Sequence, residues 1–384
     1  MRTKITLIGA AIAATIATPA LAQNSITLYG VVDDSIAYVS NQQGHSNVYM
    51  RQGNLYSSRW GLRGSEDLGQ GWKAIFDVQA GFDPNSGAEA SAGTLFNRQA
   101  FVGLQNDQYG TFTMGRQYTS MWDLVAPLNT SSNLTGATGA HPGDIDGMDT
   151  TIRANSSVKY TTSIYAGLQA SVMYGFGGEA GTMQGGNMMS AALKYAHGPF
   201  AIAAGYLYMH SSGVEGTAPS LSYGTSAVNA GYVVGSSMQD IVVAGTYQFG
   251  NATFGLNYSN VKFRPGDQSV FKDTAIFNTF GGFAKYVFSP AIDVAAGYSF
   301  TKATNANGIS DGARYHQVSL KEAYHLSKRT TIYAIQGWQH ATGQTLDAEG
   351  NIIAARPVVG DLNNTMPSSS ENQFAALLGL AVSF

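Results

Sequence analysis

The acidic side chains between residues 119 and 151 are the first candidates for chemistry in this 384-residue chain. Asp144, Asp146 and Asp149 are closely spaced, and alternating carboxylates are typical of calcium-binding loops. The calcium-loop motif ends in Glu at its twelfth position, whereas the twelfth residue counted from Asp144 is Asn155. The full motif therefore fails. Together with Asp123, these acids are interpreted as charges that line a polar passage, with solvated loop residues or a weak calcium site as alternatives.

Catalytic motifs are absent from the sequence. The chain has no cysteine, which excludes thiolate chemistry and cysteine-bound metals. The seven histidines show no metal-ligand spacing, and no H-E-x-x-H or P-loop pattern occurs. A Ser/His/acid enzyme remains an alternative, because His316 and His325 have serines nearby and a triad is recognised by geometry. We predict no enzyme activity, no cofactor and no metal.

The first 22 residues have the pattern of a cleaved export signal. Arg2 and Lys4 precede an apolar run, and Ala20-Leu21-Ala22 is a small-residue cleavage site. The run is shorter than the roughly 20 residues that a membrane helix needs. We expect Sec export, removal of residues 1–22 and a single domain over residues 23–384. Losing Arg2 and Lys4 lowers the basic count from 21 to 19 against 24 acids, so the net charge falls from −3 to −5. An acidic chain is a poor candidate for binding nucleic acid.

The elements that must position these side chains are strands, because hydrophobicity alternates with a period of two. Between residues 72 and 82, one face carries Trp72, Ala74, Phe76, Val78, Ala80 and Phe82, and the other carries Lys73, Ile75, Asp77, Gln79 and Gly81. Residues 253–259 alternate in the same way. Charged residues are only 12% of the chain, against about 25% in typical soluble domains. Low charge with many glycines and aromatics favours strands that have a lipid face and a water face.

Connections between the strands alternate in length. Short turns rich in Gly, Asn, Asp and Pro separate long polar stretches at residues 41–54, 83–94, 119–151, 178–187, 211–239, 264–273, 303–311 and 341–371. Short periplasmic turns and long extracellular loops are typical of outer-membrane barrels. We therefore predict an all-β fold, a transmembrane antiparallel β-barrel of about 16 strands with a water-filled lumen.

Several segments resemble the trimeric porins of Gram-negative bacteria, the β-proteobacterial branch in particular. They are ITLYGVVD at residues 26–33, SRWGLRGSEDLG at 58–69, LFNRQAFVGL at 95–104, GTFTMGRQY at 110–118 and NSSVKY at 155–160. The resemblance implies a homotrimeric outer-membrane channel for passive diffusion of small hydrophilic solutes and ions. It also implies that the third extracellular loop, residues 119–151, folds into the lumen and that its acids face arginines on the wall. The C-terminal strand ends on Phe384, which resembles the signal read by the outer-membrane assembly machinery.

Strand parity assigns the arginines to faces. Trp60 and Leu62 belong to the lipid face, which places Arg59 and Arg63 in the lumen. Phe101 and Gly103 are expected to point outward and Arg98 inward. An arginine in mid-membrane on the lipid face costs about 2–4 kcal/mol, which supports these assignments. The predicted pore constriction consists of Arg59, Arg63, Arg98, Asp123, Asp144, Asp146 and Asp149.

Arg116 has the parity of the outward-facing Phe112 and Met114. It is interpreted either as a trimer contact, with Glu89 as a candidate partner, or as a rim residue that reaches into lipopolysaccharide or lipid headgroups. Two further functions stay open. A receptor or adhesin would use the long loops, and a substrate-specific channel would need aromatic tracks, whereas the inward faces here show Gly, Asn, Ser, Gln and charges. Paired arginines at the neck favour anions despite the acidic chain, because a pore's narrowest ring sets its selectivity.

Overall fold

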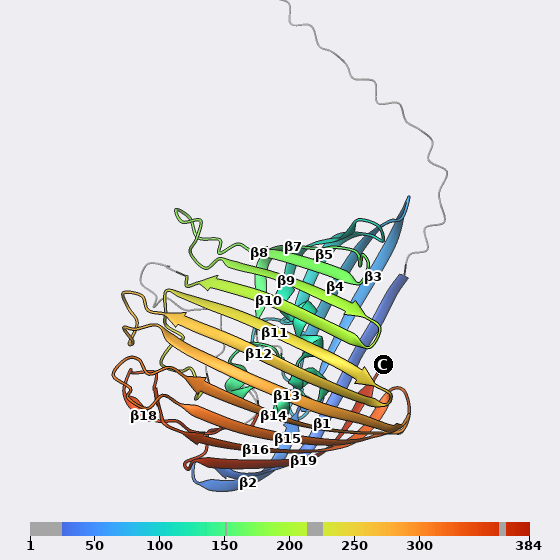
Figure 1. The fold of residues 1–384 in the computed structure, drawn as a ribbon. Coiled ribbons are helices and arrows are strands. Elements are labelled where there is room, and N and C mark those ends of the chain that lie inside the picture. Colours follow the sequence, from blue (N-terminus) through green and yellow to red (C-terminus); the bar gives the residue numbers. More distant parts are fainter. Residues whose placement is uncertain (1–24, 135, 150–151, 213–225, 361–365) are drawn as a thin grey trace, which may run out of the picture.

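The chain forms a closed antiparallel β-barrel (Figure 1). The computed structural model describes residues 25–134, 136–149, 152–212, 226–360 and 366–384, so the predicted signal lies outside the described residues. The first strands are β1 (Ser25–Gln42), β2 (His45–Gln52), β3 (Arg59–Gly69), β4 (Trp72–Gly81), β5 (Gln99–Asn106), β6 (Gly110–Tyr118), β7 (Arg153–Thr161), β8 (Leu168–Gly175), β9 (Met188–His197) and β10 (Phe200–His210). They are followed by β11 (Ser237–Phe249), β12 (Ala252–Arg264), β13 (Ala275–Ser289), β14 (Ile292–Ala303), β15 (Arg314–His325), β16 (Thr330–Thr342), the small hairpin β17 (Gln344–Leu346) and β18 (Ile352–Ala354), and β19 (Asn372–Ser383).

The barrel wall has sixteen strand positions, which confirms the predicted fold. Nineteen strands are labelled because β2 and β3 share one position and β17 and β18 form a separate hairpin. The first half of β1 pairs with β3 and its second half pairs with β2. Strands β2 and β3 are therefore two segments of one interrupted strand of the barrel wall. On its other side β1 pairs with the last strand, β19, in the register Val31↔Ser383 to Val39↔Ala375. This pairing closes the sheet, so no strand edge is left open to aggregation.

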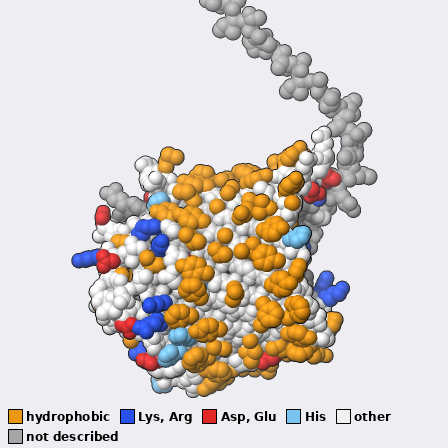
Figure 2. Space-filling view, viewed as in Figure 1, with side chains coloured by type: hydrophobic (Ala, Val, Ile, Leu, Met, Phe, Trp, Pro, Cys, Tyr) orange, Lys and Arg blue, Asp and Glu red, His pale blue; other side chains and the backbone are white. Residues whose placement is uncertain are grey.

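The outer face of the barrel is apolar, as the period of two predicts. Phe254 and Leu256 of β12 are exposed, while Asn257 and Ser259, one residue out of phase, are buried inside the barrel. The space-filling view shows hydrophobic side chains over the middle of the wall, with charged groups gathered toward the ends (Figure 2). None of the described helices is long and apolar enough to cross a membrane.

One predicted loop is mostly strand. Residues 41–54 were expected to form a long connection, but β1 runs to Gln42 and β2 begins at His45. Gln43 and Gly44 make the turn with positive φ angles of 53° and 102°, a conformation that suits a tight hairpin. Val48 and Met50 are exposed on the outer face. The polar residues of this segment therefore alternate with apolar ones along a strand, and the segment is not a loop.

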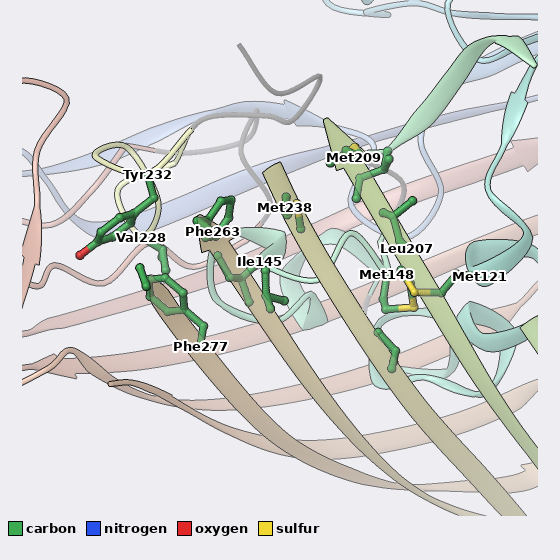
Figure 3. Close-up of a cluster of buried hydrophobic side chains, with 14 of the residues drawn as sticks. Met121, Ile145, Met148, Leu207, Met209, Val228, Tyr232, Met238, Phe263 and Phe277 are labelled. Carbon is green, nitrogen blue, oxygen red and sulfur yellow. The ribbon is translucent and has the colours of Figure 1, made fainter. Parts of the chain in front are cut away.

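Residues 119–151 are called loop 3 below, and their described parts lie inside the barrel and pack against its inner wall. Loop 3 contains α1 (Ser120–Val125), η1 (Ala126–Leu128), α2 (Thr130–Asn133), η2 (Gly136–Gly139) and η3 (Pro142–Asp144). Met121, Ile145 and Met148 of the loop join one buried cluster with Leu207 and Met209 of β10 (Figure 3).

The expectation of a polar inner face is therefore wrong for this part of the wall. Leu207, Met209 and Val242 point inward and are buried, because loop 3 rather than water covers them. The same cluster extends to the extracellular loops through Tyr232 and Phe271, whose rings meet edge to face at 5.4 Å. Loop 3 is thus held by an apolar core against one side of the barrel, which confines any water passage to the opposite side.

Candidate pore constriction

A cavity of about 470 Å³ lies between loop 3 and the opposite wall of the barrel. Its ionisable lining consists of Tyr56, Arg59, Arg98, Tyr118, Asp123, Asp149, Lys285 and Lys321. The structure therefore brings together four of the seven predicted constriction residues, two arginines and two acids. We call this cavity the neck.

Arg59 reaches the neck as parity predicts. It begins β3 and pairs in register with Gly81, while its neighbour Trp60 pairs with Ala80 on the outer face. The guanidinium of Arg59 donates from Nη1 to the carbonyl oxygen of Ser57 at 2.9 Å. This bond fixes the guanidinium of Arg59 next to the start of β3, where it lines the neck.

Arg98 also lies inside, but the parity argument that placed it there is wrong. Val102 and Leu104 are the exposed residues of β5, and Phe101 pairs with the lumen-facing Asp77. Arg98 shares the outward parity of Val102, yet it precedes the strand and so is free of its alternation. Its side chain is 6% exposed and donates to Gln79 Oε1 at 2.8 Å and to the Tyr118 hydroxyl at 2.7 Å.

Two lysines in the neck were missed by the sequence analysis. Lys321 of β15 forms a 2.6 Å ion pair with Asp293 of β14, and Lys285 of β13 lies 4.0 Å from the same carboxylate. Parity could have found Lys285, because Ala284 and Tyr286 on either side of it face outward. These strands lie about 200 residues from the arginine motifs, and only barrel closure makes them neighbours.

The acidic side of the neck is carried by loop 3. Thr119 caps α1 by accepting a hydrogen bond from the Trp122 amide at 3.0 Å, which places Asp123 in the first turn. Asp123 forms a 2.5 Å ion pair with Lys159 of β7, whose ammonium also donates to the Tyr118 carbonyl. Much of the charge of Asp123 is therefore balanced by a lysine outside the neck lining.

Asp144 and Asp146 lie elsewhere, fully buried between loop 3 and the wall. The Asp146 carboxylate contacts His141 Nδ1 at 2.5 Å, and the other ring nitrogen of His141 lies 2.8 Å from Asn257 Nδ2 on β12. Burial lowers the pKa of His141, but the Asp146 carboxylate outweighs burial and holds that pKa above its usual value. Burial likewise raises the pKa of Asp146, and His141 outweighs it, so the pKa of Asp146 is lowered. These acids anchor the loop instead of lining the neck.

Arg63 faces the lumen but lies outside the neck lining. Its guanidinium carbon is 5.2 Å from the centre of the Tyr29 ring. The Tyr29 hydroxyl donates to Asp77 at 2.5 Å, and Arg63 pairs in register with Asp77. Arg63 is four residues closer than Arg59 to the β3–β4 turn, which corresponds to about 13 Å along the strand.

The other predicted residues occupy different surfaces. Arg116 stays on the outer side, where it donates to the Asn97 carbonyl and to Asn155. No ion pair joins it to Glu89 in the described part of the chain. Phe384 exchanges two backbone hydrogen bonds with Gly30, at 3.0 and 3.1 Å, and its ring occupies the space where a Gly30 side chain would lie.

Neither histidine considered for catalysis sits in a Ser/His/acid arrangement. His325 contacts Asp293 at 2.7 Å and the Thr331 hydroxyl at 2.9 Å, and His316 lies on the outer face against the Tyr298 hydroxyl. Within the described ranges, no group of three or more His, Asp or Glu side chains is arranged to hold a metal ion.

Comparison with known proteins agrees with the β-barrel fold. A family model described as Gram-negative porin matches residues 9–344. The chain belongs to the Gram-negative porin family. An outer membrane porin protein of Bordetella pertussis is 28% identical over 371 residues, covering 86% of this chain and 93% of that protein. Outer membrane porin protein 32 of Delftia acidovorans is 28% identical over 330 residues, covering 82% and 83% of the two chains.

Solved structures share the fold. An anion-selective porin from Comamonas acidovorans superposes with a TM-score of 0.71 at 21% identity, covering 94% of this chain and all of that one. The trimer form of OmpT of Vibrio cholerae gives 0.64 at 17% identity, covering 94% and 99%. Membership of an outer-membrane porin family supports a passive channel and not an enzyme.

Proposed function

We propose that this protein is a water-filled channel of the outer membrane, through which small hydrophilic solutes and ions diffuse passively, with anions favoured. The observation that carries the proposal is the neck, a polar and charged opening left between loop 3 and the opposite wall of the barrel. A channel needs no chemistry beyond a hydrated, charged passage of fixed width.

The preference for anions follows from the charges at the neck. Its lining has four basic and two acidic side chains, a formal balance of +2, although the whole chain is acidic. Lys321 is paired with Asp293, and Asp123 with Lys159. Arg59, which forms no ion pair among the described residues, is proposed as the main charge that solutes meet, together with Lys285, whose contact with Asp293 is long at 4.0 Å; Arg98 is bound to Gln79 and Tyr118.

The width of the neck depends on the anchoring of loop 3. Thr130 donates to Asn257 at 2.8 Å, and His141 contacts the same amide, so two points of the loop attach to one residue of β12. Gln317 of β15 adds a 2.6 Å bond to the Ala140 carbonyl. These contacts hold the acids of loop 3 opposite the cations of the wall.

The assembly of the protein is proposed on the same basis. We infer a homotrimer, as described for OmpT of Vibrio cholerae, with Arg116 and Glu89 as candidate interface residues. Residues 1–22 would direct export by the Sec pathway, and the mature domain would comprise residues 23–384. Phe384 would be read by the outer-membrane assembly machinery, and the finished barrel would contact lipopolysaccharide and other outer-membrane lipids.

The test is to reconstitute the purified full-length mature protein into planar bilayers and into liposomes. We expect conductance steps in groups of three, a reversal potential with the sign of anion preference under a salt gradient, and liposome swelling in small sugars that slows with sugar size. Folded protein that neither conducts nor admits sugars would contradict the proposed function. Conductance with cation preference would contradict only the charge assignment.

A further inference from the structure

Two histidines lie directly opposite each other on the outer face of the barrel. His316 of β15 and His340 of β16 are partners in the antiparallel register, and their ring centres are 6.4 Å apart. Each alternates with buried inward neighbours along its strand, so both side chains point outward. Histidine side chains are visible on the surface of this side of the wall (Figure 2). We call these two residues the histidine pair.

One nitrogen of each ring is held by the strand on its far side. Nδ1 of His316 lies 2.7 Å from the Tyr298 hydroxyl of β14, and Nδ1 of His340 lies 3.0 Å from Oδ1 of Asn372 on β19. The strand order is β14, β15, β16, β19, so both contacts lie on the outer sides of the pair. The two nitrogens of an imidazole lie on different edges of the ring. Each Nε2 is therefore turned away from its flanking strand and toward the space that the two rings share.

The Nε2 atoms are available as ligands. In the described part of the chain, no hydrogen bond or ion pair involves Nε2 of either ring. A carboxamide oxygen can only accept, so Nδ1 of His340 carries the proton and Nε2 keeps its lone pair. The Tyr298 hydroxyl can accept a hydrogen bond from His316 in the same way. Histidines that bind metals usually have this arrangement, with the second ring nitrogen donating to an oxygen.

The separation of the rings allows both nitrogens to reach one metal ion. Bonds between a metal and a histidine nitrogen are about 2.0–2.1 Å long, so two imidazoles on one tetrahedral ion have their ring centres about 5 Å apart. The rings of the histidine pair are 6.4 Å apart. Each ring therefore has to move by less than about 1 Å, which rotation about the broad χ2 torsion of histidine can supply.

The surrounding charges indicate which cations fit. In the described part of the chain, no Asp or Glu side chain forms an ion pair with either ring, so Ca²⁺ and other cations that require oxygen ligands are disfavoured. Arg314 lies two residues from His316 on the same face, with Lys302 opposite it, and Asp311 pairs with Arg314. Only an ion that gains strongly from imidazole overcomes this positive charge, as Cu²⁺, Ni²⁺ and Zn²⁺ do.

The position of the pair gives ions access to it from water. Trp338 precedes His340 by two residues on the same face, and the two rings stack with their centres 5.9 Å apart. A tryptophan on the outer wall is typical of the aromatic girdle at the boundary of the hydrocarbon. The histidine pair lies about 7 Å farther along the strands toward the long loops, on the aqueous side of that girdle.

We propose that the histidine pair binds one divalent transition-metal ion on the outside of the barrel, with Nε2 of each ring as a ligand and water completing the coordination shell. The ion joins β15 to β16 near their loop-bearing ends. The site is separate from the neck, so the proposal is independent of conduction and of the ion preference of the channel.

Isothermal titration calorimetry of the folded full-length mature protein, without a histidine tag and in detergent micelles at neutral pH, tests this site. The titrants are Cu²⁺, Ni²⁺, Zn²⁺ and Ca²⁺. The variants His316→Gln and His340→Gln each remove one ligand. The matched control His45→Gln removes an exposed histidine at the start of β2, at the same end of the barrel. The thermal midpoint of each preparation without metal reports whether it is folded.

We expect wild-type protein to bind one ion per chain, Cu²⁺ more tightly than Ni²⁺ or Zn²⁺, with no binding of Ca²⁺. Each ligand variant should bind Cu²⁺ at least about tenfold more weakly, because removing a group that only orients a ligand already costs about 10–100-fold. The His45→Gln control should bind as the wild type does. Wild-type affinity in either ligand variant, an equal loss in the control, or Ca²⁺ binding as tight as that of Cu²⁺ would overturn the proposal.

Tryptophan fluorescence locates the ion independently. Bound Cu²⁺ quenches nearby tryptophans, and Trp338 stacks on His340. The variant Trp338→Phe should bind Cu²⁺ with the wild-type affinity but lose most of the quenching. Quenching that survives in Trp338→Phe would place the ion near another tryptophan and would also overturn the proposal. Binding should weaken as acid protonates the two imidazoles, since a protonated ring has no lone pair for the metal.

Discussion

Substituting Asp146→Asn should loosen loop 3 without unfolding the barrel. Asp146 and His141 form a 2.5 Å contact in which both side chains are almost completely removed from solvent. Loop 3 adds no strand to the barrel, so its detachment breaks none of the strand pairings that close the wall. The effect should therefore be local.

The magnitude follows from the burial of the pair. Removing one member of a buried ion pair costs about 3–5 kcal/mol when the other stays charged. His141 can avoid most of this cost by releasing its proton, because burial lowers its pKa once the carboxylate is gone. We expect about 2 kcal/mol, which raises the population of the detached loop about 30-fold.

Hydrogen–deuterium exchange followed by mass spectrometry measures this population directly. In the Asp146→Asn variant, amides of residues 141–148 should exchange about 30-fold faster, with peptides from β12 to β15 unchanged. Asp149→Asn is the matched control, since it removes the same charge from the same loop and leaves the His141 contact intact. Unchanged exchange in the first variant, or equal acceleration in the control, would refute the anchoring role of the pair.

Three further predictions concern the same loop. Folding raises the pKa of His141 above 6.5 and lowers the pKa of Asp146 below 3.8. The protection of loop 3 amides from exchange should therefore be greatest between pH 3.8 and pH 6.5. Protection should fall as the pH drops through the lowered pKa of Asp146, and also as the pH rises through the raised pKa of His141. Gly281→Ala would place a Cβ 2.6 Å from Asn257 Oδ1, so we expect a loss of about 1–3 kcal/mol, seen as a lower thermal midpoint in detergent, whereas an unchanged midpoint would contradict the close packing. Asp123→Asn leaves Lys159 without its partner, so the reversal potential should shift further toward anions, and a shift toward cations would contradict the assignment.

The fold could be predicted from the sequence because most strands of the barrel repeat the same local signal. Alternation of apolar and polar residues in segments such as residues 72–82 identifies a strand. The apolar outer face indicates that this face contacts lipid. The signal fails where polar residues alternate within a strand, which is why His45–Gln52 was taken for a loop. It also fails next to strand ends, where Arg98 is not bound by the parity of β5.

The neck was only partly predictable, because long-range contacts decide its composition. Arg59 lies on a regular strand, so its face could be assigned. Lys285 and Lys321 join it only through closure of the barrel, which no local pattern reports. Asp144 and Asp146 resemble pore acids in sequence, but their burial depends on His141 and on the β12 wall behind the loop.

Reversal potential measured under a salt gradient for Arg59→Gln and Arg63→Gln tests the central claim most directly. Both arginines lie on β3 and face the lumen, and each substitution removes one positive charge. If the neck sets selectivity, Arg59→Gln should shift the reversal potential clearly toward cations, and Arg63→Gln should leave it close to the wild-type value. Equal shifts in the two variants would show that charge anywhere in the lumen sets selectivity, which would contradict the account of the neck.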